Sequence, residues 1–181
     1  MNKSIRAFLS AAFALLVLNG GLALADGVVL TVSGSIAKTN RGPTDAFNDA
    51  LFSKLEVEFA SAYELKLDDL KRLPQVELKT IYPNWPSEVE VSGPTLKDVL
   101  SHVGADGSTV TVRAIDGYAP EFKLSDIDSS KFILAIKANG KFLGMGGRGP
   151  VWLVFSPHTY QGQPEDDSGL TWAVIHIEVK Q

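Results

Sequence analysis

The stretch from Asn139 to Pro157 contains a glycine-rich loop around Arg148, a combination that could bind a planar or anionic ligand. It opens with Asn139-Gly140, the strongest short signal for a two-residue turn between antiparallel strands. Further glycines at 144, 146, 147 and 149 surround Arg148, and their missing side chains would let the backbone approach a ligand closely. A hairpin tip without a ligand explains the same pattern equally well.

Two further aromatic residues lie where a flat ligand could stack. Trp85 lies in a loop held by Pro83 and Pro86, and Tyr118 follows Asp116-Gly117 at the end of an apolar run. Loops between strands often carry ligand contacts, so ligand stacking and ordinary packing are equally consistent with Trp85. Tyr118 has a similar pair of explanations, because it could contact a ligand or could simply belong to a turn. The other two tryptophans lie in apolar runs, which predicts core positions: Trp152 and Trp172.

The composition excludes several kinds of chemistry. The chain has no cysteine, so disulfides, thiolate nucleophiles and thiolate-bound metals are excluded. Its three histidines do not have metal-ligand spacing, and it contains no serine-hydrolase elbow, P-loop or dinucleotide-binding glycine motif. The run Glu165-Asp166-Asp167 is interpreted as a solvated loop, because a calcium site needs a clearer ligand pattern.

The first 25 residues predict a secretory signal peptide, with an uncleaved anchor as the alternative. Lys3 and Arg6 precede a short apolar stretch, and Ala23-Leu24-Ala25 offers a cleavage site. Residues 26–181 are long enough for a single domain with its own core. Loss of Lys3 and Arg6 changes the formal charge from −4 to −6, so nucleic acid is not an expected partner and membrane insertion after cleavage is not expected.

The elements that must position these residues are mostly strands. Alternating or continuous apolar runs predict strands, while a capping pattern at Thr95 and Asp98 with a stop at Gly104 predicts the best helix. The pattern indicates an α+β, mainly β domain with short helices. The predicted strands are Val28–Val32, Leu55–Phe59, Val76–Ile81, Val89–Val91, Val110–Ile115, Phe132–Lys137, Val151–Phe155 and Trp172–Val179, and the helices are Asp68–Leu73 and Thr95–Val103.

Five segments have an order and spacing that make them a fairly specific set. They are Trp85; Gly93-Pro94-x-Leu96 leading into Lys97-Asp98-Val99-Leu100; Asp116-Gly117-Tyr118; Asn139-Gly140-Lys141-x-Leu143 with Gly149-Pro150-Val151; and the closing run Trp172 to Val179. Together they resemble the sulfite-oxidase-type molybdopterin-binding domain family over about residues 28 to 179. The resemblance implies that family's fold, with mixed sheets and short helices.

The chain departs from that family in two places. Catalytic members of the family have a molybdenum-ligating cysteine shortly before the Trp85 position, whereas this chain has Thr80-Ile81-Tyr82-Pro83 there. Relatives also place basic residues after the Pro157 position to contact the cofactor's phosphate, whereas this chain has no Lys or Arg from 155 to 179. Both departures argue against molybdopterin chemistry, because a thiolate ligand and phosphate partners are missing.

The resemblance leaves a pocket for an unphosphorylated pterin without molybdenum. Trp85 or Tyr118 would stack on the pterin, Asp116 would accept from its amino edge, and Arg148 would donate to its carbonyl, with the Gly149 backbone nearby. Some exported, stand-alone relatives without the cysteine are regarded as pterin-binding regulators of membrane-bound signalling enzymes, including those of cyclic-di-GMP metabolism.

The resemblance therefore implies a periplasmic or secreted, non-catalytic pterin-binding protein that acts on the periplasmic domain of an inner-membrane sensor. Two alternatives stay open. One is a molybdopterin-dependent oxidoreductase without thiolate ligation. The other is an interaction domain that binds no ligand on the same fold.

Overall fold

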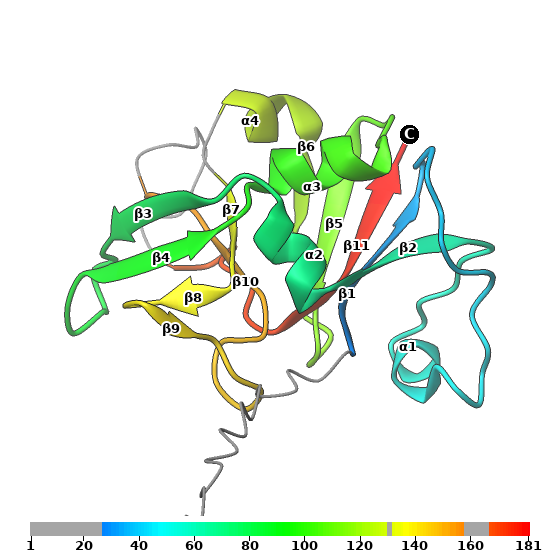
Figure 1. Cartoon of the computed structure of the whole chain (residues 1–181), viewed down its shortest axis with the longest axis horizontal. Coiled ribbons are helices and arrows are strands. Elements are labelled where there is room, and N and C mark those ends of the chain that lie inside the picture. The colour runs from blue at the N-terminus through cyan, green and yellow to red at the C-terminus, as the bar shows by residue number, and fades with distance from the viewer. Residues whose placement is uncertain (1–26, 130–131, 158–166) are drawn as a thin grey trace, which may run out of the picture.

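Strands dominate the computed structural model, which describes residues 27–129, 132–157 and 167–181 (Figure 1). The prediction of an α+β chain, mainly β with short helices, is confirmed. In chain order the described elements are β1 (Val28–Gly34), α1 (Ala50–Lys54), β2 (Ala62–Lys66), α2 (Leu67–Arg72), β3 (Val76–Thr80), β4 (Val89–Gly93), α3 (Leu96–Val103), β5 (Thr109–Ala114), β6 (Glu121–Lys123), α4 (Leu124–Ser129), β7 (Ile133–Ala135), β8 (Lys137–Ala138), β9 (Lys141–Phe142), β10 (Trp152–Val154) and β11 (Val174–Lys180).

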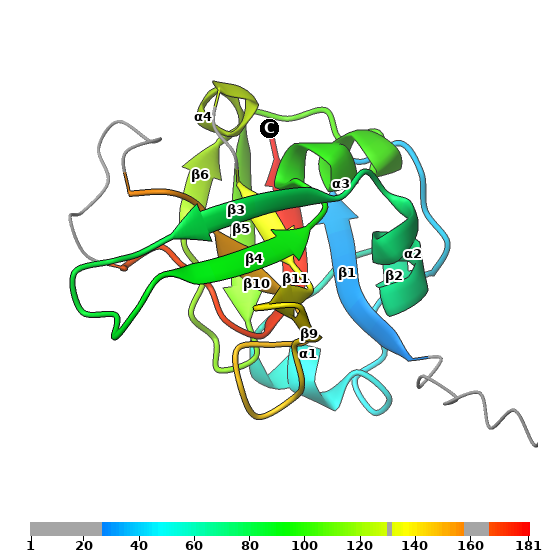
Figure 2. The ribbon, with the colours of Figure 1, turned by 60° about the vertical axis from the view of Figure 1, so that its left-hand side comes forward.

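The described strands form mixed sheets. The largest has the order β2-β1-β11-β5-β6, in which β1 and β11 are parallel and the other neighbours are antiparallel. A second sheet has the order β3-β4-β8-β9, and a third pairs β10 with β7. In Figure 2 the β3–β4 ribbon crosses in front of the strands of the largest sheet. In the largest sheet the first and last described strands, β1 and β11, are neighbours.

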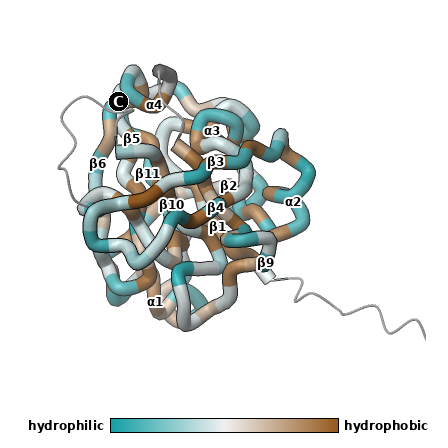
Figure 3. Tube along the Cα trace, turned by 90° about the vertical axis from the view of Figure 1, so that its left-hand side faces the viewer, coloured by the Kyte–Doolittle hydropathy of each residue, from teal (hydrophilic) through white to brown (hydrophobic). Residues whose placement is uncertain are grey.

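The core lies on one face of the largest sheet. Alternate residues on β1 and β11 are buried and apolar, as a strand with one core-facing side requires: Leu30, Val32, Ile177 and Val179. The apolar stripe of α3 belongs to the same core: Leu96, Val99, Leu100 and Val103. In Figure 3 hydrophobic colour is concentrated on strands in the interior, and the peripheral turns are mostly hydrophilic.

Helix α3 begins and ends as its sequence predicts. The Thr95 hydroxyl accepts from the Asp98 N–H at 3.0 Å, and the Asp98 carboxylate accepts from the Thr95 N–H at 3.4 Å. This capping box satisfies backbone donors that the first helical turn leaves free. Gly104 ends the helix with φ of 66°, a left-handed conformation that glycine adopts without strain.

The hairpin predicted at Asn139-Gly140 is also confirmed. Lys137 pairs with Phe142 and Ala138 with Lys141, so the two turn residues join β8 to β9. Their φ angles are 48° and 76°, as the favoured two-residue hairpin turns require.

The second face of the largest sheet is polar and is partly covered by α1 and the chain that follows it. Phe52 of α1 and Phe59 contact the imidazole of His176 on β11, with ring centroids 5.6 and 6.0 Å apart. His176 is 2% exposed, and its Nε2 forms a 2.8 Å hydrogen bond with the Ser33 hydroxyl on β1. These contacts attach the α1 segment to the sheet.

The strand predicted at Leu55–Phe59 is wrong. Glu56 has a left-handed φ of 55°, and Phe59 stacks on His176 while Val57 is buried. The apolar alternation there reflects packing against a sheet face, which can produce the same period as a half-buried strand. The neighbouring strand β2, which the sequence did not reveal, pairs with β1 instead.

The described residues include no helix that is both long enough and apolar enough to span a membrane. The predicted signal peptide, residues 1–25, lies outside the described residues.

We expect His176 to make the folded protein less stable in acid. Burial lowers its pKa to about 4, assisted by the positive charge of Arg113, while the unfolded value is near 6.5. As the pH falls from about 6.5 to about 4, the unfolded chain binds a proton that the folded chain excludes, so stability is lost in this window. The full loss is about 3 kcal/mol. Urea unfolding across that pH range should show this component in the wild type and not in His176→Gln.

Ser33→Ala provides the control for this prediction. It removes the hydrogen bond but keeps the buried imidazole, so it should lower stability at every pH and retain the acid-dependent loss. A His176→Gln variant whose stability falls with pH as steeply as the wild type would contradict the prediction.

Candidate functional site

The glycine-rich loop connects β9 to β10 and is fixed at both ends. The Leu143 N–H donates to the carbonyl of Ile136 at 2.9 Å, and the Arg148 carbonyl accepts from the Ala173 N–H at 2.9 Å. Between these points the loop is mostly exposed, and Met145 at its tip is 69% exposed. The loop therefore presents Arg148 from a defined backbone position beside the segment that leads into β11.

All three tryptophans of the chain surround the Arg148 guanidinium. The Arg148 Cζ atom lies 4.6 Å from the Trp152 ring centroid, 4.9 Å from that of Trp172 and 5.3 Å from that of Trp85. These are cation–π distances, and each ring also limits the movement of the guanidinium. The arrangement brings together two residues predicted for the site, Trp85 and Arg148, with two that the sequence predicted for the core.

Trp85 is a packed wall of this cluster. It is 8% exposed, and its ring lies 5.1 Å from Tyr82 and 5.5 Å from Trp152. Its indole N–H donates to the Asp167 carboxylate at 3.2 Å. Asp167 is thus a site residue that the sequence did not indicate, because an acidic run carries no sign that one member will contact an indole 82 residues away.

Tyr82 supports the same wall from within the core. Its hydroxyl donates to the carbonyl of Phe155 at 2.7 Å. Burial, with the negative charge of Asp167, raises the pKa of Tyr82 well above its usual value. The neutral phenol is therefore a structural hydrogen-bond donor.

Asp116 and Tyr118 lie beside the cluster and have structural contacts of their own. The Asp116 carboxylate accepts from the Tyr118 N–H at 3.0 Å and so closes the turn. The Tyr118 hydroxyl accepts from the Gly169 N–H at 3.1 Å. Because the Ile115 N–H also donates to the Ala173 carbonyl at 3.0 Å, this turn is held against the chain from Asp167 to Ala173.

The exposed surface of the site is aromatic. Trp172 is 48% exposed and Tyr118 is 46% exposed. The prediction that Trp172 is a core residue is therefore wrong, because β11 begins only at Val174 and the indole lies outside the sheet. Trp152, in contrast, is fully buried on β10 as predicted. Trp172 and Tyr118, rather than Trp85, have ring area available to a ligand.

Two groups in the cluster have unused hydrogen-bond donors. The indole N–H of Trp152 is buried and has no acceptor among the residues that the structure describes. Within residues 27–129, 132–157 and 167–181, no carboxylate forms an ion pair with Arg148, although a guanidinium has five N–H donors. The Arg148 guanidinium is only half-buried, so its donors can reach a ligand with acceptor atoms, whereas the Trp152 N–H is covered.

The residues at this site do not fit a thiolate-bound molybdenum centre. The chain has no cysteine, and Thr80, in the segment where the related family has that ligand, is buried with its hydroxyl unpaired. In the part of the chain that the structure describes, no group of three or more His, Asp or Glu side chains could hold a metal ion. Of the stretch without Lys or Arg that forms the second departure, residues 158–166 lie outside the described residues.

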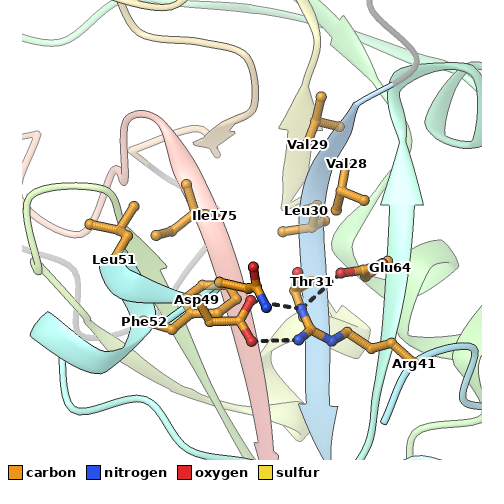
Figure 4. A pocket seen from close by; sticks show the side chains of 11 residues that line it. Val28, Val29, Leu30, Thr31, Arg41, Asp49, Leu51, Phe52, Glu64 and Ile175 are labelled. Carbon is orange, nitrogen blue, oxygen red and sulfur yellow. Dashed lines mark hydrogen bonds and ion pairs between the residues drawn. The ribbon is translucent and has the colours of Figure 1, made fainter. Parts of the chain in front are cut away.

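A cavity of about 270 Å³ lies elsewhere, between α1 and the edge of β1 (Figure 4). Its polar groups already bind one another: Arg41 donates to Asp49 at 2.6 and 3.2 Å and to Glu64 at 2.8 Å. The hydrogen bond from Arg41 holds the pKa of Asp49 below its usual value. This network ties the segment before α1 to β2, which makes it a structural link.

No protein-family model matches this chain, and no curated protein matches it at the level expected of a relative. The arrangement around Arg148 must therefore be interpreted from its own geometry.

Gly149 shows how tightly the loop closes below Arg148. A side-chain carbon at this buried position would lie 2.6 Å from the Leu143 carbonyl carbon, whereas one at Gly144 would have no atom within 4 Å. We expect Gly149→Ala to lower the free energy of unfolding by about 1–3 kcal/mol, through overpacking. Gly144→Ala, the matched control, should leave it unchanged or raise it slightly. Equal stability of the two variants in urea unfolding would contradict this account of the loop.

Proposed function

We propose that this protein is an exported, non-catalytic pterin-binding protein on a sulfite-oxidase-like fold. The observation that carries the proposal is the Arg148 guanidinium, which is held against three indole rings and has no carboxylate partner among the described residues. Such a guanidinium is a preorganised set of donors, and it suits a flat ligand with carbonyl or ring-nitrogen acceptors.

A pterin offers the complementary groups. Its carbonyl would accept from Arg148, and its ring would stack on Trp172 or Tyr118, which are 48% and 46% exposed. Its amino edge would donate to a carboxylate, for which Asp167 is placed beside Trp85 and Asp116 at the neighbouring turn.

The absence of cysteine in the chain supports binding without metal-dependent catalysis. The oxidoreductase alternative would regain support if purified protein contained stoichiometric molybdenum. The interaction-domain alternative would gain support if no pterin bound.

We expect titration with a reduced and an oxidised pterin to show saturable binding. Because all three tryptophans contact Arg148, tryptophan fluorescence, excited selectively over tyrosine, reports on this cluster and should be quenched. Arg148→Met should weaken binding roughly 10- to 100-fold, since hydrogen bonds from a charged group contribute about 1.5–3 kcal/mol. Calorimetry gives the same affinities without relying on fluorescence.

Two further variants keep this test interpretable. Arg148→Lys keeps a cation over the indoles but lacks the planar fork, so it should also bind more weakly while remaining folded. Arg72→Met removes an exposed arginine on α2, whose side chain is 74% exposed, and should bind like the wild type. If neither pterin binds the wild type, or if Arg148→Met binds as tightly, the proposal is wrong.

We further propose that pterin occupancy is reported to the periplasmic domain of an inner-membrane sensor. In the source organism, deletion of the protein should change the cellular level of cyclic-di-GMP. Arg148→Met should fail to restore that level, whereas Arg72→Met should restore it. Full restoration by Arg148→Met would show that signalling does not require the Arg148 site.

A further inference from the structure

A second cavity, separate from the Arg148 cluster, lies between the α1 segment and the polar face of the largest sheet. Its volume is about 300 Å³, close to the lower end of small-molecule sites. Figure 2 shows α1 beside the ends of the strands that form this sheet. The lining is mostly polar and comes from three places, the end of α1 with the residues after it, β5 and β11: Ser53, Glu56, Val57, Glu58, Arg113, His176 and Glu178.

Arg113 lines this cavity and has no ion-pair partner among the described residues. It lies on β5 directly opposite His176 of β11. Its Nε is buried and has no hydrogen-bond acceptor, and it forms no ion pair with any residue in the described part of the chain. The Nε itself is covered, but Arg113 is only half-buried and lines the cavity, so its guanidinium can bind a carboxylate that enters the cavity.

His176 provides a second unused group in the wall of the same cavity. His176 is 2% exposed, and its Nε2 is hydrogen-bonded to the Ser33 hydroxyl. Among the residues that the structure describes, the other ring nitrogen has no hydrogen-bond partner. A buried ring with one free nitrogen at a cavity offers a fixed polar contact to a bound molecule.

The remaining charged groups are carboxylates. Glu56 and Glu58 line one side and Glu178 the other, and Glu178 has only a long 3.9 Å contact to Lys180. With Arg113, these carboxylates leave the cavity with an excess of negative charge. A purely anionic ligand would be repelled, and a purely cationic ligand would leave Arg113 without an acceptor.

We propose that this cavity binds a free α-amino acid with a cationic side chain. The ligand's carboxylate binds Arg113, and its two cationic groups bind the glutamates around the cavity. The ligand's charges thus complement both the single guanidinium and the surplus of carboxylates. The proposal uses residues other than those of the pterin site, so either can fail without the other.

The test is calorimetric titration with L-lysine, cadaverine and L-norleucine. Cadaverine lacks the carboxylate of lysine, and norleucine lacks its side-chain ammonium. We expect saturable one-to-one binding of L-lysine. Each analogue lacks one charged group of lysine, so each should bind at least roughly ten-fold more weakly.

Substitutions then assign the two ends of the ligand. Arg113→Met should weaken lysine binding at least roughly ten-fold and should not weaken cadaverine binding, because it removes the carboxylate's partner and a positive charge from the cavity. Glu178→Gln should weaken lysine more than norleucine. Arg72→Met, which removes an exposed arginine elsewhere, should bind lysine like the wild type. Arg113→Lys provides a second variant if Arg113→Met does not fold. Its affinity for lysine should lie between that of the wild type and that expected of Arg113→Met.

Several results would overturn the proposal. These are no saturable binding of L-lysine, equal binding of cadaverine and lysine to the wild type, or unchanged lysine affinity in Arg113→Met. The first two need no variant, so the proposal remains testable even if every substitution disturbs folding.

Discussion

The parallel pairing of β1 with β11 is the contact on which the rest of this structure depends. It joins residues about 145 positions apart, such as Thr31 and His176, and places both strands in the middle of the largest sheet. Their alternate side chains form the core on one face, while the other face carries Ser33 and His176. At Gly34 the backbone approaches the Val179 carbonyl so closely that only glycine fits there. A substitution at this point would separate the two strands that organise both faces.

The features that the sequence predicted well are those that depend on neighbouring residues. The capping box of Thr95 and Asp98 and the turn at Asn139-Gly140 are local, so their residue types are sufficient to predict them. The error at Leu55–Phe59 has the opposite cause, because its alternation is produced by packing onto His176 from a distant strand. A periodic pattern indicates which side chains are buried, but it does not indicate whether the backbone forms hydrogen bonds with a neighbouring strand.

The candidate site was predictable only in part for the same reason. Arg148 and Trp85 could be selected from loop composition, but the contribution of Trp172 depends on where β11 begins, and that of Asp167 depends on a contact with Trp85. The cluster combines three segments that are distant in sequence, around Trp85, Arg148 and Trp172. The guanidinium is enclosed by indole rings only when these segments come together in the fold. Residue types alone therefore could not show whether Trp85 is packed or offers an exposed surface for stacking.

The central position of β11 also has a consequence for how the protein is made. Because β11 separates β1–β2 from β5–β6, the largest sheet cannot be completed until Val174–Lys180 have been synthesised. Until then each half presents an unpaired strand edge, which is a site where chains can associate incorrectly.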